Sequence, residues 1–153
     1  MDVETGDREI RIALGVLEEL AGYHLRRAST VFGNDFSRAM GGTGIRQVLF
    51  GILSVVAANP GINQGTAGRA LGIQRANMVS LINELVDAGL IDRRTAEEDR
   101  RAFALTITPA GSDALAAGSK RIRKHEQRLL SDLSAEERRM LIDLLQRIEA
   151  KED

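Results

Sequence analysis

Apolar side chains recur every three or four residues along most of this chain, which is the spacing of helices with one buried face. The pattern predicts a long first helix over residues 8–32 and a glycine-containing loop over residues 33–43. It then predicts a second helix over residues 44–58, which ends before Pro60. The first third of the chain is therefore expected to be helical.

Two shorter helices follow, joined by a tight turn. Asn63 has the side chain of a helix cap and precedes a short helix that ends at Gly72, and the next helix repeats apolar residues until Gly89. After Gly89 a short extended segment leads into a charged tip, and after the tip apolar and polar residues alternate with period two. This pattern predicts a β-hairpin over residues 90–107. A helix-turn-helix followed by a hairpin is the layout of a winged helix.

The last third of the chain is predicted to be helical again, and its helices have clear starting signals. Thr108 can cap a helix that has Pro109 in its first position and runs to about Leu130. Ser134 and Glu137 have the spacing of a capping box, and an apolar stripe follows them. These signals predict two helices after the hairpin.

The outer helices have more apolar surface than a small winged helix can cover. A helix over residues 8–32 would span roughly 35 Å at 1.5 Å per residue, and a two-fold interface would bury its stripe against a second copy. The alternative is a monomer in which these helices fold back over the winged helix. We expect a mainly α fold with a small β-hairpin wing: a winged helix-turn-helix over residues 44–107, with residues 8–32 and 108–150 forming a helical dimerisation region.

Composition narrows the function classes. The chain has 153 residues with a net charge of −1, so any surface that binds nucleic acid must be local. It has no Cys and two His without metal-site spacing, and no motif of an enzyme, so we expect no metal, no cofactor and no catalysis. No apolar run approaches the roughly 20 residues of a membrane span, and we expect a cytoplasmic protein.

The second helix of the helix-turn-helix begins with side chains that can read bases. Arg pairs with guanine in the major groove, and Asn or Gln pairs with adenine. At the wing, an Arg can enter the minor groove while a nearby carboxylate orients it. The positive and negative charges of residues 60–101 cancel. A polar helix start exposed to solvent, or a ladder of surface salt bridges, would contain the same residue types without binding DNA. The predicted DNA-contacting residues are Asn63, Thr66, Gln74, Arg75, Ala76, Asn77, Ser80, Arg94, Asp99, Arg100 and Arg101.

Four segments together resemble the multiple-antibiotic-resistance regulator (MarR) family. They are Leu-Gly-Ile at 71–73, Leu-Val-Asp-Ala-Gly-Leu-Ile at 85–91, the Arg pairs and Asp within 93–101, and Leu-Thr-Ile-Thr-Pro-Ala-Gly at 105–111. The resemblance implies a homodimer that binds pseudopalindromic double-stranded promoter DNA, usually as a repressor relieved by a small ligand. It matches the family's minor-groove Arg to Arg101, with Asp99 as its orienting partner.

The resemblance also has departures. The base-reading positions match Arg75, Ala76, Asn77 and Ser80, but many members have a basic residue where this chain has Ser80, and another where it has Glu84. The operator sequence therefore does not follow from the resemblance.

Family effectors are often aromatic carboxylates or phenols, which bind between the dimerisation helices and the winged helix. An Arg beside a phenol hydroxyl could hold a carboxylate, and apolar side chains could form the walls. A solvated helix face or ion pairs between subunits would produce the same residues on this helix. For His24, a packing or capping role is the better explanation. The candidate ligand-binding residues are Tyr23, His24, Arg26, Arg27, Phe36, Phe50 and Leu53.

Three hypotheses about function follow. The first is a homodimeric, ligand-responsive repressor. The second is a winged-helix module that binds proteins and has no affinity for duplex DNA. This hypothesis is supported by the neutral charge of residues 60–101 and by the acidic residues Glu84 and Asp87. The third is a MarR-like regulator that lacks an effector.

Overall fold

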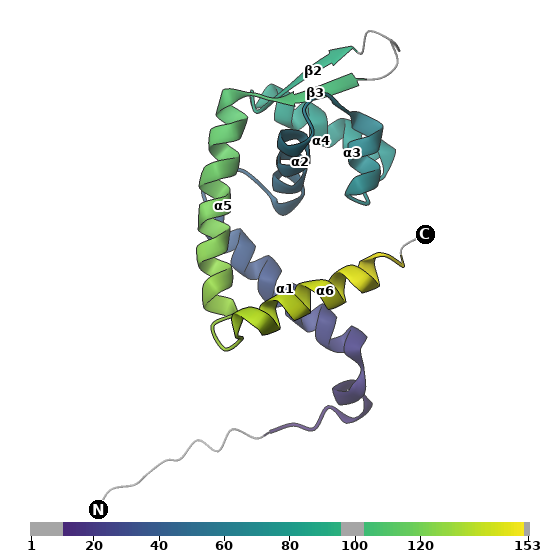
Figure 1. Ribbon diagram of the computed structural model, residues 1–153, viewed down its shortest axis with the longest axis vertical. Helices are drawn as coiled ribbons and strands as arrows, with labels where there is room; N and C mark the ends of the chain where they lie inside the picture. The colour runs from purple at the N-terminus through teal and green to yellow at the C-terminus, as the bar shows by residue number, and fades with distance from the viewer. Residues whose placement is uncertain (1–10, 96–102, 152–153) are drawn as a thin grey trace, which may run out of the picture.

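The computed structural model describes residues 11–95 and 103–151. A compact head of short helices and strands lies at one end, and long helices extend from it (Figure 1). In chain order the elements are η1 (Gly15–Glu19), α1 (Ala21–Ala39), α2 (Gln47–Ala58), β1 (Ile62–Asn63), α3 (Gln64–Ala70), α4 (Arg75–Asp87), β2 (Ile91–Thr95), β3 (Phe103–Ile107), α5 (Pro109–Leu129) and α6 (Ala135–Glu149). The mainly α fold with a small β wing is confirmed.

The head is a winged helix-turn-helix with one apolar core. Its helices α2, α3 and α4 pack with the sheet, and Gly72 makes the turn between α3 and α4 with a φ of 64°, a conformation that favours glycine. The residues that form this core are Leu49, Ile52, Leu53, Val56, Ala67, Met78, Ile82, Leu85, Ile91 and Leu105. The predicted helix-turn-helix and hairpin are thus both present.

The sheet has three antiparallel strands in the order β1-β3-β2. The hairpin pairs Ile91 with Ile107 at its base, and β1 adds Ile62 opposite Leu105 on the other side of β3. The sequence analysis missed β1, because a strand of two residues is too short to show a period-two pattern.

The predicted first helix over residues 8–32 is wrong at both ends within the described residues. The short 3₁₀ helix η1 is followed by Leu20, whose backbone is extended with ψ of 110°, and α1 begins only at Ala21. At the other end α1 continues to Ala39, through residues predicted to be a loop. Contacts made by Asp35, Ala39 and Met40, which are buried, override the weak helix propensity of the glycine- and asparagine-containing segment.

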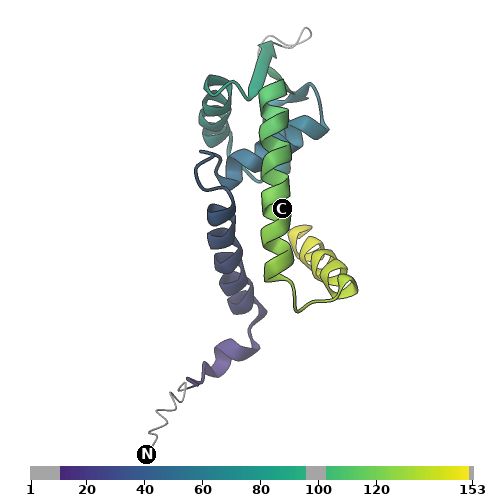
Figure 2. The same cartoon turned by 90° about the vertical axis from the view of Figure 1, so that its left-hand side faces the viewer.

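The long helices α1 and α5 lie side by side below the head, and α6 turns back from the end of α5 (Figure 2). Thr108 caps α5 by accepting a hydrogen bond from the backbone N–H of Gly111, and Pro109 follows it as predicted. The capping box of Ser134 and Glu137 at the start of α6 is also confirmed. None of the helices in the described parts of the chain has the length and hydropathy needed to cross a membrane.

Candidate nucleic-acid interface

The first turn of α4 presents the predicted base-reading side chains to solvent. Gln74 is the N-cap residue of α4, and Arg75, Ala76, Asn77 and Ser80 are all exposed. At about 100° per residue, a helix that buries Met78, Ile82 and Leu85 must expose the opposite side, and this is where Ala76 and Ser80 lie. The structure therefore leaves all of these predicted residues accessible, with Ala76 and Ser80 on the side of α4 opposite the core.

The side chains predicted for α3 have internal partners. The Asn63 side-chain oxygen accepts hydrogen bonds from the backbone N–H groups of Gly65 (2.8 Å) and Thr66 (3.2 Å), which confirms its capping role. The Thr66 hydroxyl accepts a hydrogen bond from Arg69 at 3.1 Å. Asn63 thus retains its amide N–H groups for a ligand, while its oxygen belongs to the cap.

Arg93 attaches the wing to α4. Its guanidinium donates a hydrogen bond to the side-chain oxygen of Asn83 at 2.6 Å and lies 5.0 Å from the ring centroid of Phe103. Sequence reasoning missed this attachment, because Asn83 lies on a different element from Arg93. Arg94 is exposed beside it, whereas Asp99, Arg100 and Arg101 lie outside the described residues.

A groove of about 530 Å³ runs between α3, α4 and the wing strand β3. Two cations, Arg69 and Arg75, border it, and exposed Val79 and Phe103 give it an apolar part. The side-chain oxygen of Gln64, which also lines the groove, is buried without a hydrogen-bond partner among the described residues. Of the residues that line the groove, the sequence analysis predicted Asn63 and Arg75 as contacts, and the others become neighbours only through the fold.

Arg46 and Glu84 form an ion pair beside this surface. Both guanidinium Nη atoms donate to the carboxylate, at 2.7 and 3.0 Å. The hydrogen bond from Arg46 is the main cause that lowers the pKa of Glu84 from its ordinary value, and it thereby favours the ionised carboxylate.

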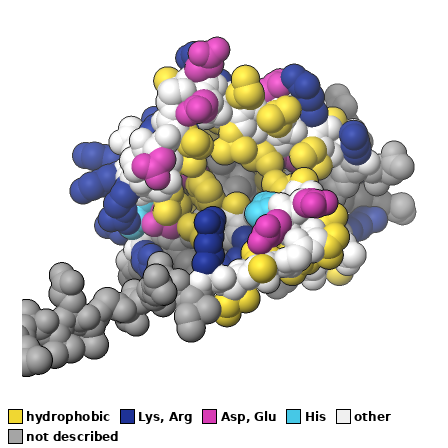
Figure 3. Space-filling model, turned by 90° about the horizontal axis from the view of Figure 1, so that it is seen from below, with side chains coloured by type: hydrophobic (Ala, Val, Ile, Leu, Met, Phe, Trp, Pro, Cys, Tyr) yellow, Lys and Arg dark blue, Asp and Glu magenta, His cyan; other side chains and the backbone are white. Residues whose placement is uncertain are grey.

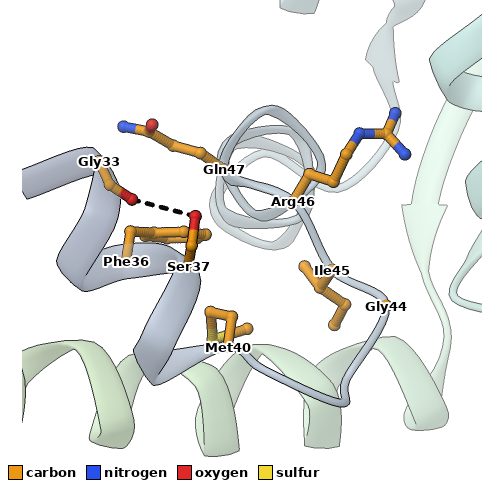
Figure 4. Close-up of a pocket in the computed structure, with 8 residues that line it drawn as sticks. All are labelled: Gly33, Phe36, Ser37, Met40, Gly44, Ile45, Arg46 and Gln47. Carbon is orange, nitrogen blue, oxygen red and sulfur yellow. Dashed lines mark hydrogen bonds between the residues drawn. The ribbon is translucent and has the colours of Figure 1, made fainter. Parts of the chain in front are cut away.

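A second hollow, of about 370 Å³, lies where α1 ends and α2 begins. Figure 4 shows Phe36 and Ser37 on α1, Met40 at its end and Ile45 in the connection to α2, with the guanidinium of Arg46 turned away from them. The hollow therefore has an apolar wall with polar groups at its rim, the combination that small-molecule sites use.

Of the predicted ligand-binding residues, the structure places only Phe36 in the lining of this hollow. Phe50 packs against Phe36 with ring centroids 6.0 Å apart, and Leu53 is fully buried in the core of the head. Arg26 is ten residues before Phe36 on α1, about 15 Å along the helix axis. The predicted residues are therefore spread over separate regions of this protomer.

The remaining polar candidates lie near the start of α1. Tyr23 and Arg27 lie in its first two turns with Arg26. His24 is close to both η1 and Tyr23: its Nε2 atom lies 2.9 Å from the carbonyl oxygen of Glu18, and its ring contacts that of Tyr23 edge-on at 5.3 Å. No group of three or more His, Asp or Glu side chains within the described ranges is arranged to hold a metal ion.

Comparisons with known proteins agree with this geometry. A MarR family model matches residues 45–102. A protein of Thauera aromatica named as a transcriptional regulatory protein for the hcr operon is 38% identical over 128 residues, which are 83% of this chain and 77% of that protein. The chain belongs to the MarR family. It is thus a MarR-type transcriptional regulator with a DNA-binding winged helix.

Two solved structures of another MarR-type protein, the transcriptional repressor CouR, are similar over nearly the whole chain. CouR bound to a 23-mer DNA duplex has 34% sequence identity and a TM-score of 0.86, and the match covers 90% of this chain and 98% of CouR. CouR bound to p-coumaroyl-CoA has 31% identity and a TM-score of 0.81, covering 92% of this chain and 99% of CouR.

Proposed function

We propose that this MarR-family protein is a homodimeric repressor that binds pseudopalindromic promoter DNA and releases it when a small aromatic ligand binds. The observation that carries the proposal is the exposed first turn of α4, which presents Arg75, Ala76 and Asn77 in succession to solvent. An exposed recognition helix of this kind fits the major groove, and Arg and Asn have the chemistry to read guanine and adenine there. Such a role requires access to the chromosome, so we place the protein in the cytoplasm.

The similarity to CouR supports the DNA-binding part, because CouR was solved on a duplex and matches this chain at 34% identity. The predicted wing contact of Arg101, oriented by Asp99, belongs to the same proposal. We assign Arg94 and Arg100 to the phosphates beside that contact, since guanidinium groups neutralise phosphate charge.

The homodimer is supported by apolar side chains outside the head. Seen from the end opposite the wing, hydrophobic side chains gather in the middle of this face, with charged groups around them (Figure 3). A surface of this kind is typical of a protein interface. In a two-fold dimer the same surface of each subunit would be buried against the other. The exposed apolar residues of η1, α1, the residue between them and α6 include Val16, Leu17, Leu20, Leu25, Val31, Met140, Ile142, Leu144 and Ile148.

The ligand is proposed to be an aromatic acid or its coenzyme A thioester. CouR was solved with p-coumaroyl-CoA, and the hollow at Phe36 and Met40 has a volume within the usual range of small-molecule sites. An aromatic ring would pack against Phe36, and Gln47 and Ser37 at the rim have hydrogen-bonding groups for its substituents.

Fluorescence anisotropy with duplexes from the promoter region of the protein's own gene tests the DNA-binding part. We expect one dimer per site, and Arg75→Ala should weaken binding by about tenfold or more, because a bidentate base contact contributes roughly 1–3 kcal/mol. Arg147→Ala, which removes an exposed Arg of α6, is the matched control and should bind as wild type. A wild-type protein without duplex affinity at low salt would instead favour the protein-interaction module.

The same assay tests the ligand. Addition of p-coumaroyl-CoA or free p-coumarate to the complex should lower the anisotropy in a concentration-dependent way. If a wider set of aromatic acids and thioesters also leaves the complex intact, the protein is a MarR-family regulator without such an effector.

A further inference from the structure

Arg46 and Glu84 connect the start of α2 to the recognition helix α4. The guanidinium and the carboxylate meet in a bidentate pair, with Nη1 2.7 Å from Oε1 and Nη2 3.0 Å from Oε2. The two residues are 38 positions apart, so the fold brings them together. Bidentate geometry fixes both side chains in one relative orientation, which a single contact between long side chains would not do.

Glu84 lies on the side of α4 that also carries Ser80. It comes one helical turn after Ser80, and both are exposed, whereas Ile82 and Leu85 between and beside them are buried. A duplex seated against the exposed side of α4 would therefore have its phosphates near Glu84. An unpaired carboxylate in this position would repel them.

The charges of α4 make this repulsion important. The helix contains one cation, Arg75, and two anions, Glu84 and Asp87, so alone it has an excess of one negative charge. The guanidinium of Arg46 cancels that excess. A Glu carboxylate is ionised at neutral pH, and the pairing with Arg46 lowers the pKa of Glu84 further, so only a partner cation can offset its charge.

We propose that Arg46 is a positioning residue for DNA binding. It holds the Glu84 carboxylate toward the start of α2 and cancels its charge, which allows the second half of α4 to approach the phosphate backbone. Arg46 gives one N–H of each Nη atom to Glu84, so we expect its main effect on DNA to pass through Glu84. The inference rests on the proposed DNA-binding surface and adds a residue that lies outside α4 and the wing.

A double-mutant cycle tests the inference on the full-length protein. The probe is a duplex selected by the wild-type protein from a random pool, and the dissociation constant is measured for Arg46→Gln, Glu84→Gln and the double variant at low and high salt. Arg147→Gln is the matched control, because Arg147 pairs with Asp143 on α6, an exposed ion pair far along the chain from α4. Thermal unfolding of each variant shows whether stability has changed.

At low salt Arg46→Gln should bind about three- to tenfold more weakly, the size expected for one uncompensated charge near phosphates in water. The difference should shrink at high salt, because exposed charges are screened. Glu84→Gln should bind at least as tightly as wild type, and the double variant should lie within about twofold of Glu84→Gln, since Arg46 then has no charge left to cancel. The Arg147→Gln control should bind as wild type.

Two results would overturn the inference. A double variant as weak as Arg46→Gln would mean that Arg46 contacts DNA directly, and an Arg46→Gln variant that binds as tightly as wild type would mean that the Glu84 charge has no effect. Failure of the proposed function is distinguishable from both, because then neither the wild type nor Glu84→Gln would select any duplex.

Discussion

Gly111, in the first turn of α5, lies directly against the chain that leaves α4. A Cβ atom at this position would be 2.0 Å from the carbonyl oxygen of Leu90 and 2.8 Å from the side chain of Ile107. Thr108 reinforces the contact, because its hydroxyl donates to the carbonyl of Gly89 at 2.7 Å and accepts from the N–H of Gly111. The junction between the head and α5 therefore depends on a residue without a side chain.

Gly111→Ala should lower the free energy of unfolding by about 2 kcal/mol or more, because the carbonyl of Leu90 belongs to backbone that cannot move without disturbing the sheet. Urea denaturation measures the change. Gly33→Ala is the matched control: this glycine is within α1, has no atom within 4 Å of a built Cβ, and should gain roughly 0.5–1 kcal/mol from better helix propensity. Equal stability of Gly111→Ala and wild type would contradict the close contact.

At the scale of elements, a buried carboxylate joins α1 to α5. Asp35 is 4% exposed, and its Oδ1 atom lies 2.9 Å from Nδ1 of His125 and 3.5 Å from a guanidinium nitrogen of Arg128. His125 is 90 residues away from Asp35 in the sequence, and Arg128 lies one helical turn further along α5. This contact explains why α1 continues through residues that by local propensity should end it.

Asp35→Ala should lower the free energy of unfolding by about 1–3 kcal/mol, because His125 loses its buried hydrogen-bond partner. His125→Ala and the double variant complete a cycle in urea, and we expect a coupling energy of about 1 kcal/mol. Arg147→Ala, which breaks an exposed pair within one helix, should change stability by less than about 0.5 kcal/mol. If the effects of Asp35→Ala and His125→Ala are simply additive, the pair does not hold α1 against α5.

The elements differ in how far the sequence determines them. Asn63, Thr108 and Ser134 start helices through bonds to residues two or three positions away, so their signals are visible in the sequence and were predicted. The end of α1 and the pair of Arg46 and Glu84 depend on contacts between distant segments, which no periodic pattern encodes. For the same reason the exposed first turn of α4 was predicted, whereas the groove at Gln64 and most of the hollow lining were not.

At the scale of the whole molecule, α6 carries an apolar stripe that the rest of the described chain leaves partly exposed. Met140, Leu144 and Ile148 recur every four residues, so they share one side of the helix, and all three are about half exposed. Together with α1 they form the surface that we propose a second copy covers.

Leu144→Glu should convert the dimer into monomers, because it places a charge in the middle of an apolar interface. Sedimentation equilibrium measures the mass, and DNA affinity should fall with it, since each subunit then binds alone. Gln146→Glu introduces the same charge at an exposed polar position of α6 and should remain dimeric. A Leu144→Glu protein that keeps the mass of a dimer would exclude this stripe from the interface.

The short strand β1 also bears on how MarR-type regulators can be recombined. Ile62 and Asn63 pair with β3, the N–H of Gly61 donates to the carbonyl of Leu105 at 2.8 Å, and the same Asn63 caps α3. A chimera that exchanged only β2 and β3 would therefore replace the strand on which β1, and through Asn63 the start of α3, depends. An exchanged segment should begin no later than Gly61, and it must also fit the core side chains of α2.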